Sequence, residues 1–215
     1  MPTTIYDLTH EINTNMLVYP GTPPVQINRI NTLEQAGFRE TQLVLTSHVG
    51  THLDAPAHLL KTGRPLDQFP PEKFWGQAFF INCLTCREEI SLRHLQPAKD
   101  QLATVDFVIL VTGHGKKWPD STYLGPFPTL TREAAEWLVQ HPLKAVGTDT
   151  ISIDRMNSRD LPIHHIFLEK EVLIIENIKI PEALIGRRAE LVLAPLKFNR
   201  ADGATVRILA KREEK

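Results

Sequence analysis

Four residues that can bind a metal ion or transfer a proton lie within eleven positions, and all have even numbers: His48, His52, Asp54 and His58. Residues at even positions share one face of an extended chain, but at roughly 3.3 Å per residue His48 and His52 would then be about 13 Å apart. That separation is too large for one ion, so the segment is predicted to fold back. Gly50 and Pro56 stand where the turns are needed, because glycine adopts backbone angles closed to other residues and proline fixes its own φ.

The chemistry of these side chains points to a divalent cation. Imidazole nitrogen and carboxylate oxygen suit zinc, and also manganese or iron. The cluster contains no thiolate, which argues against a closed structural zinc site, whereas three protein ligands with an open position are typical of a catalytic ion. The alternative is a loop whose histidines only bond to the backbone, and the density of four ligand-type residues disfavours it.

The composition indicates one globular domain. A chain of 215 residues is long enough for one well-buried core and short for two, and 42% hydrophobic with 23% charged residues excludes a mostly disordered chain. The net charge of −1 gives no electrostatic case for binding nucleic acid or an anionic membrane. The first residues lack a secretion signal and no stretch reaches the length of a membrane span, so a cytoplasmic location is expected.

The two cysteines, Cys83 and Cys86, form a C-x-x-C that closes an apolar, strand-like run. A zinc ribbon needs a second such pair, and a thioredoxin-type pair opens a helix after a strand. The pair is therefore interpreted as reduced, incidental thiols, with a redox or metal function as the alternative.

Strands are predicted on both sides of the histidine cluster. Residues 5–8, 25–31 and 38–46 have strand-like patterns, and a rigid, proline-rich loop occupies 18–24. The cluster therefore begins just past the end of a strand, where binding residues are commonly displayed.

The later segments complete a strand-rich α/β pattern. A helix is predicted between Thr131, a suitable N-cap, and Pro142, which ends it. Further strands are expected at 77–84, 106–112, 144–147, 172–178, 190–195 and 205–210. About eight strands with few helices predict a single α/β domain with a mixed, strand-rich core over residues 1–215, in which 211–215 form a frayed tail.

Glu176 is a carboxylate inside an apolar, strand-like run. An unpaired buried charge costs several kcal/mol, so a positive partner is expected near it. His164 and His165 lie upstream and could supply that partner. The alternatives are that Glu176 caps a turn or pairs with Arg187 or Arg188.

The cluster as a whole reads H-x-G-T-H-x-D-x-P-x-H without a mismatch. This pattern resembles the signature of the cyclase family of metal-dependent hydrolases, which includes bacterial kynurenine formamidases (arylformamidases). The resemblance extends from Asp-Leu-Thr-His at residues 7–10 to Ala-Pro-Leu-Lys at 194–197. It implies a compact, swivelling β/β/α-type fold.

The resemblance also implies a binuclear metal site. In the family a ligand histidine precedes a ligand glutamate by twelve residues, and His164 has that spacing from Glu176, with His165 as the neighbouring alternative. One divalent ion, zinc or alternatively manganese, would be held by the first three residues of the motif: His48, His52 and Asp54. His164 would hold the second ion, with Asp54 and Glu176 as bridges.

His58 is predicted to donate and accept a proton, as the last histidine of the family pattern does, because an imidazole titrates near neutral pH. The alternative is a further metal ligand. Four histidines stand alone and are expected at the surface or in the core: His10, His94, His114 and His141. Of these, His114 is a candidate substrate contact. Asp149 is expected either to orient a ligand histidine or to form a turn.

Together these residues predict amide hydrolysis, in which a metal-activated water attacks a carbonyl carbon and His58 protonates the departing nitrogen. The resemblance implies an aryl formamide such as N-formyl-kynurenine, cleaved to kynurenine and formate in tryptophan catabolism. Formamidases carry Trp-Pro-Gly-Asp where this chain has Tyr-Pro-Gly-Thr at 19–22, and Tyr19 could still stack on an aryl ring. A cyclic amide such as isatin, another aryl amide and a metal-binding protein without turnover are the alternatives. The resemblance further implies a homodimer or a higher homo-oligomer.

Overall fold

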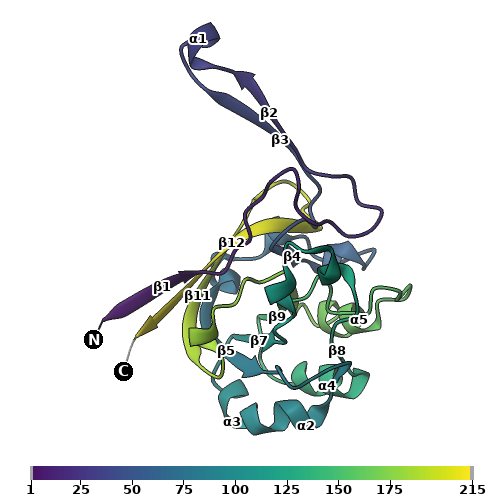
Figure 1. Cartoon of the computed structure of the whole chain (residues 1–215). Helices are drawn as coiled ribbons and strands as arrows, with labels where there is room; N and C mark the ends of the chain where they lie inside the picture. The colour runs from purple at the N-terminus through teal and green to yellow at the C-terminus, as the bar shows by residue number, and fades with distance from the viewer. Residues whose placement is uncertain (1, 214–215) are drawn as a thin grey trace.

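Eight strands of the computed structural model, which describes residues 2–213, form one mixed sheet in the order β1-β12-β11-β5-β7-β9-β10-β4 (Figure 1). They span Thr3–Asp7 (β1), His52–Asp54 (β4), Trp75–Asn82 (β5), Phe107–Val111 (β7), Ala145–Thr148 (β9), Leu173–Glu176 (β10), Arg188–Pro195 (β11) and Gly203–Glu213 (β12). The four strands from β5 to β10 run parallel. Because β4 pairs with both β10 and β12, the sheet closes into a barrel and leaves β1 outside on β12.

β7 shows how one apolar strand serves two cores. All five of its residues are buried. Phe107 and Ile109 pack inside the barrel, whereas Val108 and Leu110 pack against a layer of helices on the outer face. A strand covered on both faces is continuously apolar, which is why this segment lacks a polar alternation. The predicted strands at 77–84 and 106–112 are therefore confirmed as core elements.

Four short helices cover the parallel strands from outside: Leu92–Leu95 (α2), Lys99–Leu102 (α3), Arg132–Leu138 (α4) and Pro162–Leu168 (α5). α4 begins as predicted, because the side chain of Thr131 accepts a hydrogen bond from the backbone N–H of Ala134 at 3.2 Å. The sequence did not predict α5, which has Pro162 at its first turn and carries both His164 and His165. No helix within residues 2–213 is long and apolar enough to cross a membrane.

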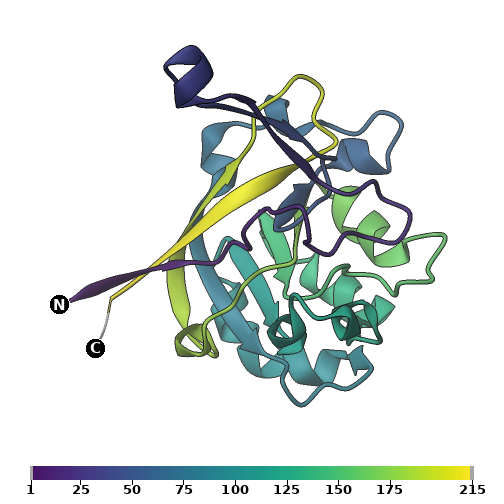
Figure 2. The same cartoon turned by 45° about the horizontal axis from the view of Figure 1, so that its top comes forward.

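A hairpin of Gln26–Asn31 (β2) and Glu40–Val44 (β3), with Leu33–Ala36 (α1) at its tip, stands away from the barrel (Figures 1 and 2). Both strands were predicted, but they pair only with each other. Every residue of β3 is exposed. The hairpin and its tip expose five large apolar side chains: Ile30, Leu33, Phe38, Leu43 and Val44.

The C-terminal end of the described chain corrects one expectation. The frayed tail predicted at 211–215 is wrong for residues 211–213, because β12 continues to Glu213 and pairs there with Thr3 of β1. Residues 214 and 215 lie outside the described part. The remaining elements are the strands Glu89–Ile90 (β6) and Thr129–Leu130 (β8) and seven 3₁₀ turns at Pro56–His58, Leu66–Gln68, Pro71–Phe74, Gln96–Ala98, His114–Lys117, Ser121–Leu124 and Glu182–Leu184. The fold is thus a single α/β domain with a strand-rich, barrel-like sheet.

Candidate metal centre

The H-x-G-T-H-x-D-x-P-x-H segment folds back at the two predicted positions. Gly50 has φ of +62°, and a Cβ there would lie 2.9 Å from Cε of Met16, so only glycine fits without strain. Pro56 opens a 3₁₀ turn that ends at His58. Between these turns the chain forms β4, a three-residue strand that the sequence did not predict. The turns bring the ring centroids of His48 and His52 to 5.3 Å.

The register of β4 places the carboxylates beside the imidazoles. Leu53 points into the barrel interior, so His52 and Asp54 lie on the opposite face. On the antiparallel neighbour β10, Glu176 is the register partner of His52. Helix α5 packs against β10 and brings His164 to the same place.

Five side chains converge there into two overlapping groups of metal-ligand type: His48, His52 and Asp54, and Asp54, His164 and Glu176. Within each group the candidate ligand atoms all lie within 4.8 Å of one another. Oδ1 of Asp54 is 2.6 Å from Nδ1 of His48 and 3.3 Å from Nε2 of His52, while Nε2 of His164 is 3.3 Å from Oε1 of Glu176. The structure therefore brings together every predicted ligand and places Asp54 between the two groups.

The partners of Glu176 decide between the alternatives raised by the sequence. Its carboxylate faces His52 and His164 and accepts a hydrogen bond from the backbone N–H of Ile153 at 2.7 Å. Pairing with an arginine is wrong, because Arg188 donates instead to Gln101 and Thr104, and Arg187 lines a different hollow from the one that Glu176 borders. His165 is not in the cluster either, since it lies on the exposed side of α5 beside Glu169.

The charged groups of the cluster are suited to binding a cation. Burial alone would raise the pKa of Asp54, but the charge of His52 and hydrogen bonds from His164 and His48 hold it well below its usual range. Burial likewise opposes protonation of His52, yet the carboxylates of Asp54 and Glu176 raise its pKa to about 10. The cation-free cluster therefore holds protons on its imidazoles, which a metal ion would displace because its ligands must be deprotonated.

Asp154 is a buried residue that the sequence did not single out. Its carboxylate accepts hydrogen bonds from the backbone N–H groups of Ile163 and His164 and lies 2.7 Å from Nδ1 of His164. It thus anchors the first turn of α5 and holds the outer nitrogen of a candidate ligand. Its only signal in the sequence is its place shortly before a Leu-Pro pair, where it reads as an ordinary turn residue.

His58 belongs to neither of the two groups of candidate ligands, although its ligand-type atom lies within 4.8 Å of those of His48 and Asp202. Its ring centroid is 4.0 Å from that of His48 and 6.2 Å from that of His164. Burial lowers the pKa of His58, and the nearby charge of Asp54 only partly offsets this effect. The imidazole is therefore mainly neutral near pH 7 and able to accept a proton.

The cluster forms one wall of a pocket with a volume of about 410 Å³. The loop before the hairpin also lines this pocket, with Leu17, Val18 and Tyr19. Tyr19 therefore borders the pocket, and its contact with a substrate stays a prediction. However, its hydroxyl donates a hydrogen bond to the Met156 carbonyl oxygen at 2.7 Å, so the ring is the part that remains for stacking.

Two further candidates from the sequence lie elsewhere. His114 is buried, as expected of an isolated histidine, and its Nε2 lies 2.8 Å from the Tyr123 carbonyl oxygen; it does not line the pocket. Asp149 fits neither of its two alternatives: its carboxylate accepts hydrogen bonds from the backbone N–H groups of Thr112 and Gly113, so it anchors the distant loop that follows β7. Cys83 and Cys86 are free and buried in the core between sheet and helices.

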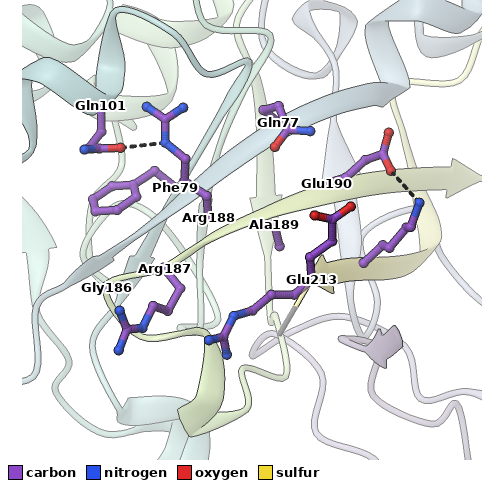
Figure 3. Close-up of a pocket in the computed structure, with 11 residues that line it drawn as sticks. Gln77, Phe79, Gln101, Gly186, Arg187, Arg188, Ala189, Glu190 and Glu213 are labelled. Atoms are coloured by element: carbon purple, nitrogen blue, oxygen red, sulfur yellow. Dashed lines mark hydrogen bonds and ion pairs between the residues drawn. The ribbon is translucent and has the colours of Figure 1, made fainter. Parts of the chain in front are cut away.

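A second hollow, of about 640 Å³, lies over β5, β11 and β12 (Figure 3). Two contacts join residues that line it: Arg188 donates a hydrogen bond to the amide oxygen of Gln101, and Lys211 lies 3.8 Å from Glu190. None of the residues that line it is a histidine or an aspartate. The candidate metal chemistry therefore belongs to the smaller pocket.

The chain is similar to several known proteins over nearly its whole length. The family model described as putative cyclase matches residues 6–155. Kynurenine formamidase of Bordetella petrii is 26% identical over 208 residues, covering 96% of this chain and 97% of the relative. The Bacillus cytotoxicus kynurenine formamidase is 27% identical over 209 residues, covering 95% and 96%. Isatin hydrolase A from Labrenzia aggregata superposes with a TM-score of 0.87 at 22% identity, covering 99% and 94%, which shows a shared fold.

Proposed function

We propose, from the premise that this chain belongs to the cyclase family, that it is a metal-dependent hydrolase of aryl amides. The observation that carries the proposal is the pair of overlapping ligand groups, which share the buried Asp54 and lie beside His58 at the wall of a pocket. A metal-binding relative without turnover would need neither the pocket nor the proton-transferring histidine.

The residues present fit two divalent ions. His48, His52 and Asp54 would hold the first and His164 the second, with Asp54 and Glu176 as bridges, because each carboxylate has two oxygens. Nitrogen and oxygen donors without sulfur suit zinc, and manganese is the alternative. When bound, such ions lower the pKa of a water and polarise a carbonyl group.

The chain's own residues transfer the protons and orient the substrate. His58 is mainly neutral near pH 7, so it can take a proton from the attacking water and deliver it to the departing nitrogen. That delivery matters because an amine anion is a very poor leaving group. Tyr19 and Leu17 line the same pocket as the cluster and can contact an aryl ring bound there.

As the first candidate substrate we propose an aryl formamide such as N-formyl-kynurenine. The relatives named kynurenine formamidase support this choice. A neutral cyclic or aryl amide is the second candidate, and the pocket lining favours it. Among the described residues, no lysine or arginine lines the pocket, and its acids are the metal-centre residues Asp54 and Glu176. Outside the metal centre, the ammonium and carboxylate of an amino-acid substrate would therefore meet neutral polar groups such as those of Thr22 and Ser158.

The test is a rate measurement on metal-loaded protein with four substrates: N-formyl-kynurenine, formanilide, isatin and nitrophenyl acetate. We expect hydrolysis of at least one amide, lost after chelation and restored by zinc or manganese. The ratio of rates between N-formyl-kynurenine and formanilide then separates the two candidates. A protein that holds its ions but cleaves none of the amides would contradict the proposal.

We further propose that the chain forms a homodimer through the β2–β3 hairpin, and that it acts in the cytoplasm. A two-stranded hairpin is at best marginally stable alone, and this one exposes apolar side chains away from the barrel. A second copy would cover them.

Light scattering is expected to give twice the 24.3 kDa chain mass. The Phe38→Glu, Leu43→Glu double variant should be monomeric, whereas Gln26→Glu with Gln42→Glu adds the same charge to the hairpin and should stay dimeric. A monomeric native protein would overturn this proposal.

A further inference from the structure

The candidate ligand histidines share a pattern in how their two nitrogens are used. One nitrogen faces the buried carboxylates, and the other is held by an acceptor outside them. Nδ1 of His52 lies 2.8 Å from the Gly50 carbonyl oxygen, and Nδ1 of His164 lies 2.7 Å from Asp154. A neutral imidazole has one N–H and one lone pair, so an acceptor on the outer side leaves the lone pair on the inner nitrogen.

For His48 the outer acceptor is Asp202. Nε2 of His48 lies 3.0 Å from Oδ2 of Asp202, while Nδ1 lies 2.6 Å from Oδ1 of Asp54. Without Asp202, the carboxylate of Asp54 would draw the ring hydrogen to Nδ1. That hydrogen would then occupy the position from which His48 must offer its lone pair to a cation.

The backbone around Asp202 is shaped to fit the His48 ring. The hydroxyl of Ser47 donates to the same carboxylate oxygen at 3.3 Å, and the backbone N–H of Ala55 donates to the Asp202 carbonyl oxygen at 2.9 Å. At the next residue, a Cβ on Gly203 would lie 2.9 Å from Nε2 of His48, so a side chain there would push the ring away. The turn therefore fixes both the carboxylate and the ring.

Asp202 differs from Asp154 in its exposure, which makes it accessible to mutation. The side chain of Asp202 is 44% exposed, against 3% for Asp154. Its removal should therefore leave the core intact. Asp202 also borders the proton-transfer site, because its ligand-type atom and those of His48 and His58 all lie within 4.8 Å of one another.

We propose that Asp202 is a positioning residue that fixes the ligating tautomer of His48 and thereby sets the affinity of the first metal ion. This inference rests on the proposed function only in that the cluster binds metal. Outer partners of ligand histidines typically change metal affinity by about 10–100-fold when they are removed.

The test compares Asp202→Ala and Asp202→Asn by zinc titration of metal-free protein in competition with a chromophoric chelator. In Asp202→Ala we expect one of the two ions to bind about 10–100-fold more weakly and the other to bind as in the native protein. Asp202→Asn should lose less, because its amide oxygen can still accept the Nε2 hydrogen. The matched control is Asp67→Asn, since Asp67 anchors the same loop through the backbone N–H of Ala201 at 3.1 Å. Native affinity in Asp202→Ala, or an equal loss in Asp67→Asn, would overturn the inference.

A spectroscopic readout separates positioning from a loss of folding. In the zinc-loaded native protein, ¹H–¹⁵N spectra should show a slowly exchanging hydrogen on Nε2 of His48. That signal should exchange rapidly in Asp202→Ala and persist in Asp67→Asn, and its persistence in Asp202→Ala would count against the inference. A zinc-loaded protein that shows these differences but cleaves no amide would contradict the proposed activity and leave the role of Asp202 standing.

Discussion

Replacing His58 by alanine is expected to reduce the turnover of an amide by about 10²–10⁴-fold while the bound metal stays nearly unchanged. The structure supports a loss of turnover without a loss of metal, because His58 lies beside the two ligand groups and not in them. Burial lowers its pKa, so it can accept and return a proton. The loss should depend on the leaving group. Nitrophenyl acetate releases a stable anion that scarcely needs a proton, so its hydrolysis should fall much less. Initial rates on both substrates and metal analysis of the same samples measure the effect.

The matched control is His165→Ala. This histidine adjoins His164 in the sequence but lies on the exposed side of α5, so its removal should change neither rates nor metal content. If His58→Ala instead loses an ion and slows both substrates equally, His58 is a metal ligand, and the proton must come from another group.

The second large effect is expected at Glu176. The native protein should hold close to two divalent ions per chain and lose its activity to a chelator. Glu176→Gln should weaken the binding of the second ion by at least about 10–100-fold. Mutation of a residue that only contacts a metal ligand already costs this much affinity, and Glu176 is itself a candidate ligand. The first ion should be less affected, because His48 contacts Asp54 and not Glu176. Plasma emission analysis after dialysis gives the stoichiometry, and chelator competition gives the two affinities.

Glu169→Gln is the matched control for this experiment, because it removes an equivalent charge at the exposed end of α5. It should bind both ions normally. A single ion per chain in active native protein would contradict the binuclear model. Equal weakening of both ions in Glu176→Gln would instead show that its carboxylate supports His52 as much as His164, both of which it faces.

The sequence predicts the parts of the site whose signal is local or chemically unusual. His48, His52 and Asp54 are adjacent in one motif, and Glu176 is conspicuous as a charge within an apolar strand. β4 was missed because three residues are too short for a clear hydrophobic period. α5 was missed because, unlike α4 of the same length, it has no N-cap side chain that marks its start. Asp154 and Asp202 look like ordinary loop aspartates, and only the folded chain shows which imidazole each one faces. The separation of β2 and β3 from the barrel is likewise a tertiary property that strand patterns do not contain.

The position of β4 also bears on how the protein is synthesised. β4 carries His52 and Asp54 early in the chain, but its neighbours β10 and β12 are far along it, and β12 is the last element described. A nascent chain emerges from its N-terminal end, so the ribosome releases the first ligands long before the strands that hold them. Pairing across such distances is slow, because a long loop must close before any contact stabilises it. β4 therefore gains its first partner only after β10 has been synthesised, and its other edge stays unpaired until residues 203–205 reach it.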